Sequence, residues 1–221
     1  MHTYSQVASD VVRAANGIDF AYRRVDNRGG IPLVLANYFA ANLDDWDPLI
    51  VDGLAADRDV ITFDYPGIGS SSGTTPATVT ELASDCVAFL HALGLTSVDF
   101  LGHSLGGMVA QQIASSDPDM IRRMILCGTG PRGGEKLTFT ELSIDELSDP
   151  VALLLNSFYT PSDTSQAAGH AYLDRLSRRV ANRDAPVSMS AAATQLGAIR
   201  EWGEIPTTDR YACSRRSGNR H

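Results

Sequence analysis

The chain has 221 residues, the size of one domain or of one domain with an insertion, and 43% of them are hydrophobic, enough for a sizeable core. Its net charge of −8 disfavours nucleic acid or an anionic membrane as a partner, and no apolar run is long enough to span a bilayer. Residues 1–10 lack a basic start and an apolar stretch, so we expect no signal peptide and a cytoplasmic location.

The N-terminal part of the chain alternates apolar strands with helices. We predict strands over residues 17–25, 31–36, 60–63, 98–101 and 124–127, and helices over residues 46–56, 78–93 and 108–115. Thr78 and Glu81 form a capping box at the start of the second helix, and Gly94 ends it. Strands that alternate with helices predict an α/β fold with a mostly parallel, doubly wound sheet.

The pattern of predicted strands and helices changes after Gly134. No clear strand follows in residues 135–202, whereas helices are predicted around residues 149–159, 165–183 and 188–202. We therefore expect a core over residues 1–134 and a helical cap insertion over residues 135–205, lying over the strand ends. The remaining residues, 206–221, form a basic tail without apolar periodicity.

The three cysteines are odd in number and scattered along the chain. Cys86 lies on the apolar face of a predicted helix, Cys127 lies in an apolar strand, and Cys213 lies in the tail. We expect buried, reduced thiols rather than a disulfide or a metal site. No cluster of cysteine and histidine has the spacing of a zinc site, so the sequence predicts no metal.

The most informative motif is Gly102-His103-Ser104-Leu105-Gly106-Gly107. It follows an apolar run and precedes a segment with helical spacing, which is the context that a G-x-S-x-G nucleophile elbow requires. The glycines let the strand and the helix approach closely around a strained turn. The motif therefore predicts Ser104 as a catalytic nucleophile.

A serine nucleophile needs a base, normally a histidine oriented by a carboxylate. In this architecture both partners follow the serine in the chain. Only His170 and His221 do so, and we expect His170 on the helix surface and His221 at an end that is not held in place. His91 lies on a polar helix face, and His103 is expected to pack beside the site.

Backbone N–H groups are expected to bind the oxyanion of the reaction. One donor is the N–H of Leu105 at the start of the elbow helix, where the helix dipole also favours negative charge. The second is expected in the loop after the strand over residues 31–36, with Phe39 as first choice and Tyr38 as second. Tyr38, His103 and Trp46 are predicted to line the substrate pocket, although such aromatic residues are more often plain core.

Three motifs occur in the order and at the spacing of a known family. They are Asn37-Tyr38-Phe39, Asp64-Tyr65-Pro66-Gly67-Ile68-Gly69-Ser70 and the Ser104 motif. Together they resemble the α/β-hydrolase superfamily, and in particular its small esterases and non-haem haloperoxidases. The resemblance implies an eight-stranded sheet, a Ser–Asp–His triad, a helical cap, no cofactor and a small-molecule acyl substrate.

The chain departs from the family pattern at two places. Asn37-Tyr38 stands where the family has His-Gly, which changes the support of the oxyanion hole but leaves backbone donors in place. Residues 211–221 carry three arginines and a histidine where the family has the last two strands, the acid and the base. We expect those two strands to be lacking through truncation or a frameshift, the alternative being a natural short variant with a basic tail.

The sequence therefore predicts an esterase-type serine hydrolase, which the loss of the C-terminal Asp and His would impair. Two alternatives stay open. One is a non-catalytic protein that binds a small ligand on the same fold. The other is formation of a peroxyacid from an ester and hydrogen peroxide, as in haloperoxidases and perhydrolases.

Overall fold

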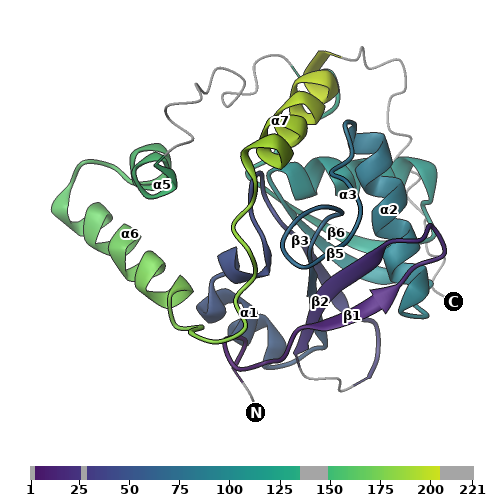
Figure 1. The fold of residues 1–221 in the computed structure, drawn as a ribbon, viewed down its shortest axis with the longest axis horizontal. Helices are drawn as coiled ribbons and strands as arrows, with labels where there is room; N and C mark the ends of the chain where they lie inside the picture. Colours follow the sequence, from purple (N-terminus) through teal and green to yellow (C-terminus); the bar gives the residue numbers. More distant parts are fainter. Residues whose placement is uncertain (1–2, 26–28, 135–148, 205–221) are drawn as a thin grey trace, which may run out of the picture.

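The computed structural model of the protein describes residues 3–25, 29–134 and 149–204. Its centre is a six-stranded sheet in the order β1-β2-β4-β3-β5-β6 (Figure 1). The strands are β1 (Asp10–Arg13), β2 (Asp19–Val25), β3 (Leu33–Ala36), β4 (Val60–Phe63), β5 (Val98–His103) and β6 (Ile121–Cys127). β1 pairs with β2 and β2 pairs with β4 in antiparallel orientation, whereas β4, β3, β5 and β6 run parallel to one another. This confirms the mostly parallel sheet. The strand β1 was not predicted from the sequence.

Helices lie on both faces of the sheet, α1 on one face and α2, α3 and α7 on the other. The described helices are the short 3-10 helix η1 (Leu43–Asp45), α1 (Pro48–Ala55), α2 (Val79–Ala92), α3 (Leu105–Ser116), α5 (Pro150–Phe158), α6 (Asp163–Leu176) and α7 (Met189–Glu204). Val34 belongs to the core cluster of α2, α3 and α7, whereas Leu33 and Leu35 belong to the cluster of α1. Because neighbouring residues of a strand point to opposite faces, the two clusters lie on opposite sides of the sheet.

Most predicted helix boundaries agree with the structure. Thr78 and Glu81 form the expected capping box, and Gly94 follows α2 with a φ of 72°. The predicted helix over residues 165–183 is wrong at its end, because α6 stops at Leu176. Beyond it, the backbone turns with Asn182 at a φ of 51°, and the carbonyl of Asn182 accepts from the Arg179 guanidinium.

A buried ionic network ties the segment between α6 and α7 to the core. Arg23 on β2 is 1% exposed and its guanidinium lies 2.7 Å from the carboxylate of Asp44. The backbone N–H of Asp184 donates to the same carboxylate at 2.8 Å, and Arg179 donates to the carbonyl of Val7 at 2.7 Å. These contacts fix the chain at the point where it returns to the core and enters α7.

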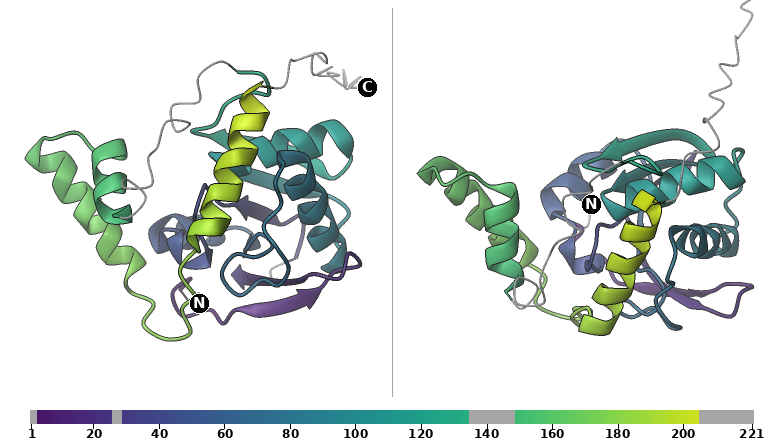
Figure 2. Two further views of the ribbon diagram at one scale, coloured as in Figure 1. Left: turned by 45° about the horizontal axis from the view of Figure 1, so that its top comes forward. Right: turned by 90° about the horizontal axis from the view of Figure 1, so that it is seen from above.

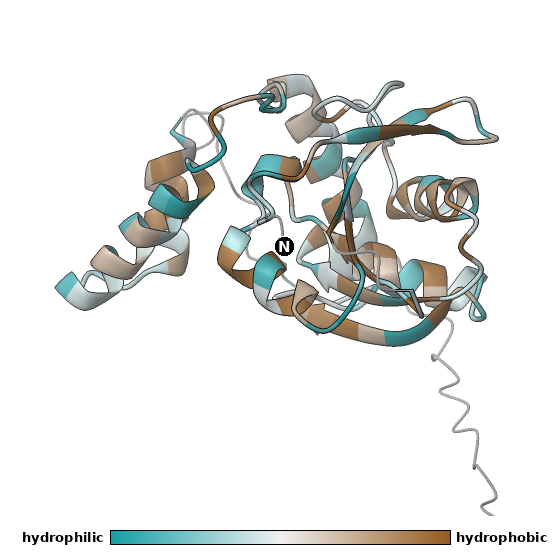
Figure 3. Ribbon diagram, turned by 90° about the horizontal axis from the view of Figure 1, so that it is seen from below, coloured by the Kyte–Doolittle hydropathy of each residue, from teal (hydrophilic) through white to brown (hydrophobic). Residues whose placement is uncertain are grey.

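Helices α5 and α6 stand apart from the sheet, whereas α7 packs on it (Figures 1, 2 and 3). α6 reaches the core through Arg175, which forms a bidentate pair with Asp47, and through the Tyr172 hydroxyl, which donates to the carbonyl of Asp45. In the part of the chain that the structure describes, no helix has the length and apolar character of a membrane span.

The strand β6 lies at the edge of the sheet and is largely exposed. Met124, Ile125 and Leu126 are 39%, 44% and 42% exposed, although all three are apolar. The expectation of a buried Cys127 is wrong, since this free thiol is exposed; Cys86 is buried as expected. The reason is that no strand among the described residues pairs with the outer edge of β6. Cys213 and the tail over residues 206–221 lie outside the described residues.

The buried Arg23 network predicts a large cost for removing one partner. Arg23→Met leaves Asp44 buried with its nearest remaining guanidinium, that of Arg179, 3.6 Å away, so we expect the free energy of unfolding to fall by roughly 3 kcal/mol. Arg13→Met is the control, because the Arg13–Asp19 pair is exposed and such pairs contribute less than about 1 kcal/mol. Urea unfolding of both variants measures this, and equal losses would contradict the account.

Candidate active site

Ser104 lies at a sharp turn between a buried strand and a helix. β5 ends at His103, α3 begins at Leu105, and Ser104 between them has φ 51° and ψ −113°. A positive φ is rare for a residue with a side chain and costs on the order of 1–3 kcal/mol. The turn is held from both sides, because the Ser104 N–H donates to the carbonyl of Cys127 at 2.9 Å and the Ser104 carbonyl accepts from the N–H of Gly107 at 2.9 Å.

The glycines of the motif are required by close packing around this turn. A Cβ at Gly102 would overlap the backbone of Gly106 across the turn. A Cβ at Gly106 would overlap the carbonyl of Ala36, at the end of β3. The first turn of α3 is therefore packed directly against the start of the loop that follows β3, over residues 37–42.

This loop after β3 carries the predicted second donor. The N–H of Tyr38 is engaged, since it donates to the side-chain oxygen of Asn37 at 3.0 Å. Among the described residues, the N–H groups of Phe39 and Leu105 donate to no acceptor. The first choice, Phe39, is thus compatible with an oxyanion donor, and the role stays a prediction.

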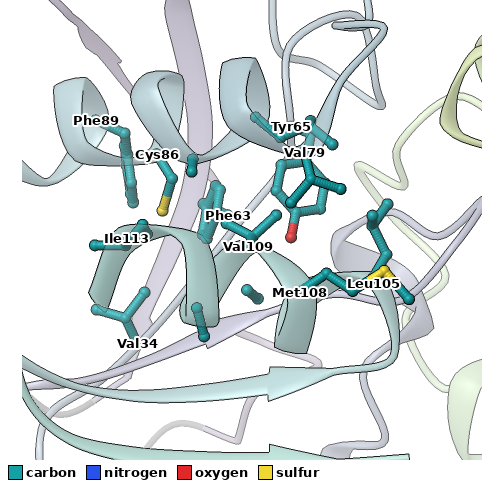
Figure 4. Packing of buried hydrophobic residues seen from close by; sticks show 14 of the residues in the cluster. Val34, Phe63, Tyr65, Val79, Cys86, Phe89, Leu105, Met108, Val109 and Ile113 are labelled. Carbon is teal, nitrogen blue, oxygen red and sulfur yellow. The ribbon is translucent and has the colours of Figure 1, made fainter. Parts of the chain in front are cut away.

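Aromatic rings occur beside Ser104 in the chain and in the loop after β3. The His103 ring meets the Tyr38 ring edge-on at a centroid distance of 5.1 Å, and burial lowers the pKa of the imidazole. Burial also raises the pKa of Tyr38 well above its usual value, and the carboxylate of Asp45 adds to this. Tyr65 is packed beside Leu105 and Met108 in the core between α2 and α3 (Figure 4).

Two further aromatic residues lie elsewhere. Trp46 is 7% exposed and packs with Leu33, Leu35 and Val51 in the cluster of α1, on the other face of the sheet from Leu105. Phe158 on α5 is 59% exposed. The pocket-lining role of Tyr38, His103 and Trp46 remains a prediction.

Among the described residues, no histidine side chain forms a hydrogen bond with the Ser104 hydroxyl. His91 on α2 and His170 on α6 are exposed, as expected. His103 lies next to Ser104 in the chain, but no hydrogen bond between the two side chains is formed. His221 falls outside the described residues.

Comparison with known proteins agrees with this geometry. The family model described as alpha/beta hydrolase fold matches residues 31–212, which is most of the chain. The chain belongs to the alpha/beta hydrolase fold family. The match includes β3, the elbow and α7, so the hydrolase family pattern covers every element described above around Ser104.

Several known proteins are similar to this chain. An alpha/beta hydrolase fold protein from Chitinophaga pinensis superposes with a TM-score of 0.89 at 38% identity, over 94% of this chain and 76% of that one. The pimeloyl-[acyl-carrier protein] methyl ester esterase of Aliivibrio salmonicida is 29% identical over 76% of this chain and 64% of its own length. The poly(3-hydroxyalkanoate) depolymerase of Ectopseudomonas oleovorans is 36% identical over 44% of this chain and 35% of its own length.

The chain spans only part of many relatives. The first seven curated proteins that it matches are covered over 28–41% of their length. The shared region supports the family and its fold, whereas the activity of this chain is a proposal.

The structure places one residue at the site that the sequence does not reveal. Gln195 on α7 is fully buried, and its side-chain oxygen accepts from the N–H of Ala40 in the loop after β3 at 2.8 Å. The two residues are 155 positions apart. The helical periodicity of α7 predicts a buried face, but no local pattern says which loop that face meets.

Asp45 supplies a pH-dependent contribution to stability close to this loop. Burial, together with the carboxylates of Asp44 and Asp184, raises its pKa to about 6 from 3.8. Between about pH 4 and pH 6, the folded chain keeps a proton that the unfolded chain has released. The free energy of unfolding contributed by Asp45 therefore falls as the pH rises through this window.

Asp45→Asn should remove this titration while keeping an oxygen acceptor for the N–H of Asn42. Relative to the unchanged chain, the variant should gain stability as the pH rises from about 4 to about 6 and then level off, with a total gain of roughly 1–3 kcal/mol. Urea unfolding at a series of pH values measures the difference. A difference that stays constant with pH would show that Asp45 has no raised pKa.

Proposed function

We propose that this chain is a serine hydrolase of esterase type and that Ser104 is its nucleophile. The observation that carries the proposal is the backbone of Ser104, whose φ of 51° places a half-buried serine at the junction of β5 and α3. A strained backbone of this kind persists only where the surrounding structure holds it, and such positions cluster at active sites.

The proposed reaction is acyl transfer in two steps. The Ser104 Oγ attacks the carbonyl carbon of a small acyl ester and gives its proton to a base, and the alcohol leaves with a proton from the same base. Water then cleaves the acyl-enzyme and restores the serine. The N–H groups of Leu105 and Phe39 are the proposed donors to the oxyanion, and the dipole of α3 adds to their effect.

The ester class rests on the family and on one relative. The Aliivibrio protein that resembles this chain is named a methyl ester esterase. An uncharged ester also suits a site whose predicted lining includes the packed rings of Tyr38 and His103. The division into a core over residues 1–134 and a cap over residues 135–205, and the cytoplasmic location, remain predictions.

A non-catalytic ligand-binding protein is the second candidate. This candidate is favoured because no histidine of the described residues forms a hydrogen bond with the Ser104 hydroxyl, and a serine without a base is a poor nucleophile. In known serine hydrolases, removal of the histidine lowers turnover by about six orders of magnitude. The reactivity of Ser104 therefore separates the two candidates.

A fluorophosphonate probe tests the proposal directly. We expect the purified chain to be labelled at Ser104, as located by peptide mass spectrometry, and to hydrolyse p-nitrophenyl acetate. Ser104→Ala should abolish both signals while circular dichroism and the melting temperature stay unchanged. A folded chain that is neither labelled nor active would contradict the proposal, and melting shifts with small esters but no turnover would then favour the binding protein.

A further inference from the structure

The loop after β3 is held by a residue of α7 that has no assigned role. Gln195 has no exposed surface, and its Oε1 accepts the N–H of Ala40 at 2.8 Å. The orientation of the carboxamide is set by this contact, because a backbone N–H requires an oxygen and not an NH2 group as its partner. Gln195 thus links a helix from the far end of the chain to the loop beside the elbow.

The contact falls next to the proposed oxyanion donor. Ala40 has a φ of 54°, a conformation that a residue with a side chain rarely adopts without support. On one side of Phe39, the N–H of Tyr38 is held by the side chain of Asn37, and on the other side the N–H of Ala40 is held by Gln195. The N–H of Phe39 therefore lies between two anchored peptide groups.

The rest of the loop is also braced. The side-chain amide of Asn37 donates to the carbonyl of Asn42 at 2.6 Å, and the N–H of Leu43 donates to the carboxylate of Asp64 at 2.8 Å. These bonds fix the two ends of the loop, whereas Ala40 near its middle depends on α7. Removal of the Gln195 contact should therefore loosen the part of the loop that includes Phe39.

The choice of glutamine at this position has a cost. Its Nε2 is buried and has no hydrogen-bond partner among the described residues, and an unsatisfied buried donor is destabilising. An apolar residue would fill the same place on α7, where Leu196 and Ile199 are also buried, without that cost. The benefit of a carboxamide here is the oxygen that it presents to Ala40.

We propose that Gln195 is a positioning residue that sets the direction in which the Phe39 N–H points, so that it can donate to the oxyanion. Activity then requires that α7 is packed against the loop after β3. This inference rests on the proposed function for its chemical consequence. Its structural part, the control of the loop by Gln195, stands separately. The two parts are tested by different measurements.

Gln195→Leu removes the acceptor and the unsatisfied donor together. We expect the variant to fold and to melt at most a few degrees lower than the unchanged chain, because the loss of the acceptor for the Ala40 N–H is offset in part by the removal of the unsatisfied Nε2. The amide of Ala40 should exchange its hydrogen roughly tenfold faster, as measured by NMR. The kcat of ester hydrolysis should fall by about two orders of magnitude with little change in KM, as for the loss of an oxyanion donor.

Two further variants serve as controls. Gln195→Glu keeps an oxygen for Ala40 and should restore the slow exchange of that amide. Thr194→Val changes the neighbouring residue on α7, whose hydroxyl bonds within the helix to the carbonyl of Ser190, and should change neither exchange nor kcat.

The outcomes separate the inference from the proposed function. Unchanged exchange at Ala40 in Gln195→Leu, or an unchanged kcat in an active chain, would overturn the inference. If the unchanged chain shows no labelling of Ser104 and no turnover, the proposed function fails. Faster exchange at Ala40 in that case would still support the structural part.

Discussion

The left-handed backbone of Ser104 is the constraint on which the structure around the site depends. It lets a strand turn directly into a helix, and it is held by a hydrogen bond from the Ser104 N–H to the carbonyl of Cys127 and by the close packing of Gly102 and Gly106. Because a Cβ at Gly106 would overlap the carbonyl of Ala36, the same turn is packed against the end of β3. The elbow and the loop after β3 are therefore one packed unit.

The helices from the C-terminal part of the chain complete this unit. α7 contributes Trp202 to the core and Gln195 to the loop after β3, while Arg23 and Asp44 hold the segment that leads into α7. α5 and α6 stand further out, and α6 reaches the core through the Arg175–Asp47 pair and the Tyr172 hydroxyl. The structure thus divides the helices after Gly134 into one that belongs to the site and two that lie beside it.

Local patterns in the sequence predict much of the fold and little of the support of the site. Short motifs predict the elbow and the capping box at Thr78, because the interactions that form these features join residues close together in the sequence, and the alternation of strands with helices predicts the parallel strands. The exposure of Cys127 depends on what lies beyond β6, and the contact of Gln195 with Ala40 joins residues 155 positions apart. Beyond the end of α6, Arg179 donates to the carbonyl of Val7, a contact with the start of the chain that helical periodicity does not predict.

A crystal structure of the chain after reaction with an organophosphonate tests the central claim most directly. The account predicts a phosphonyl group on the Oγ of Ser104, with its oxygen about 3 Å from the N–H groups of Leu105 and Phe39, and a positive φ at Ser104. An oxygen that points away from both N–H groups, or a Ser104 whose backbone lies within a continuous helix, would contradict it.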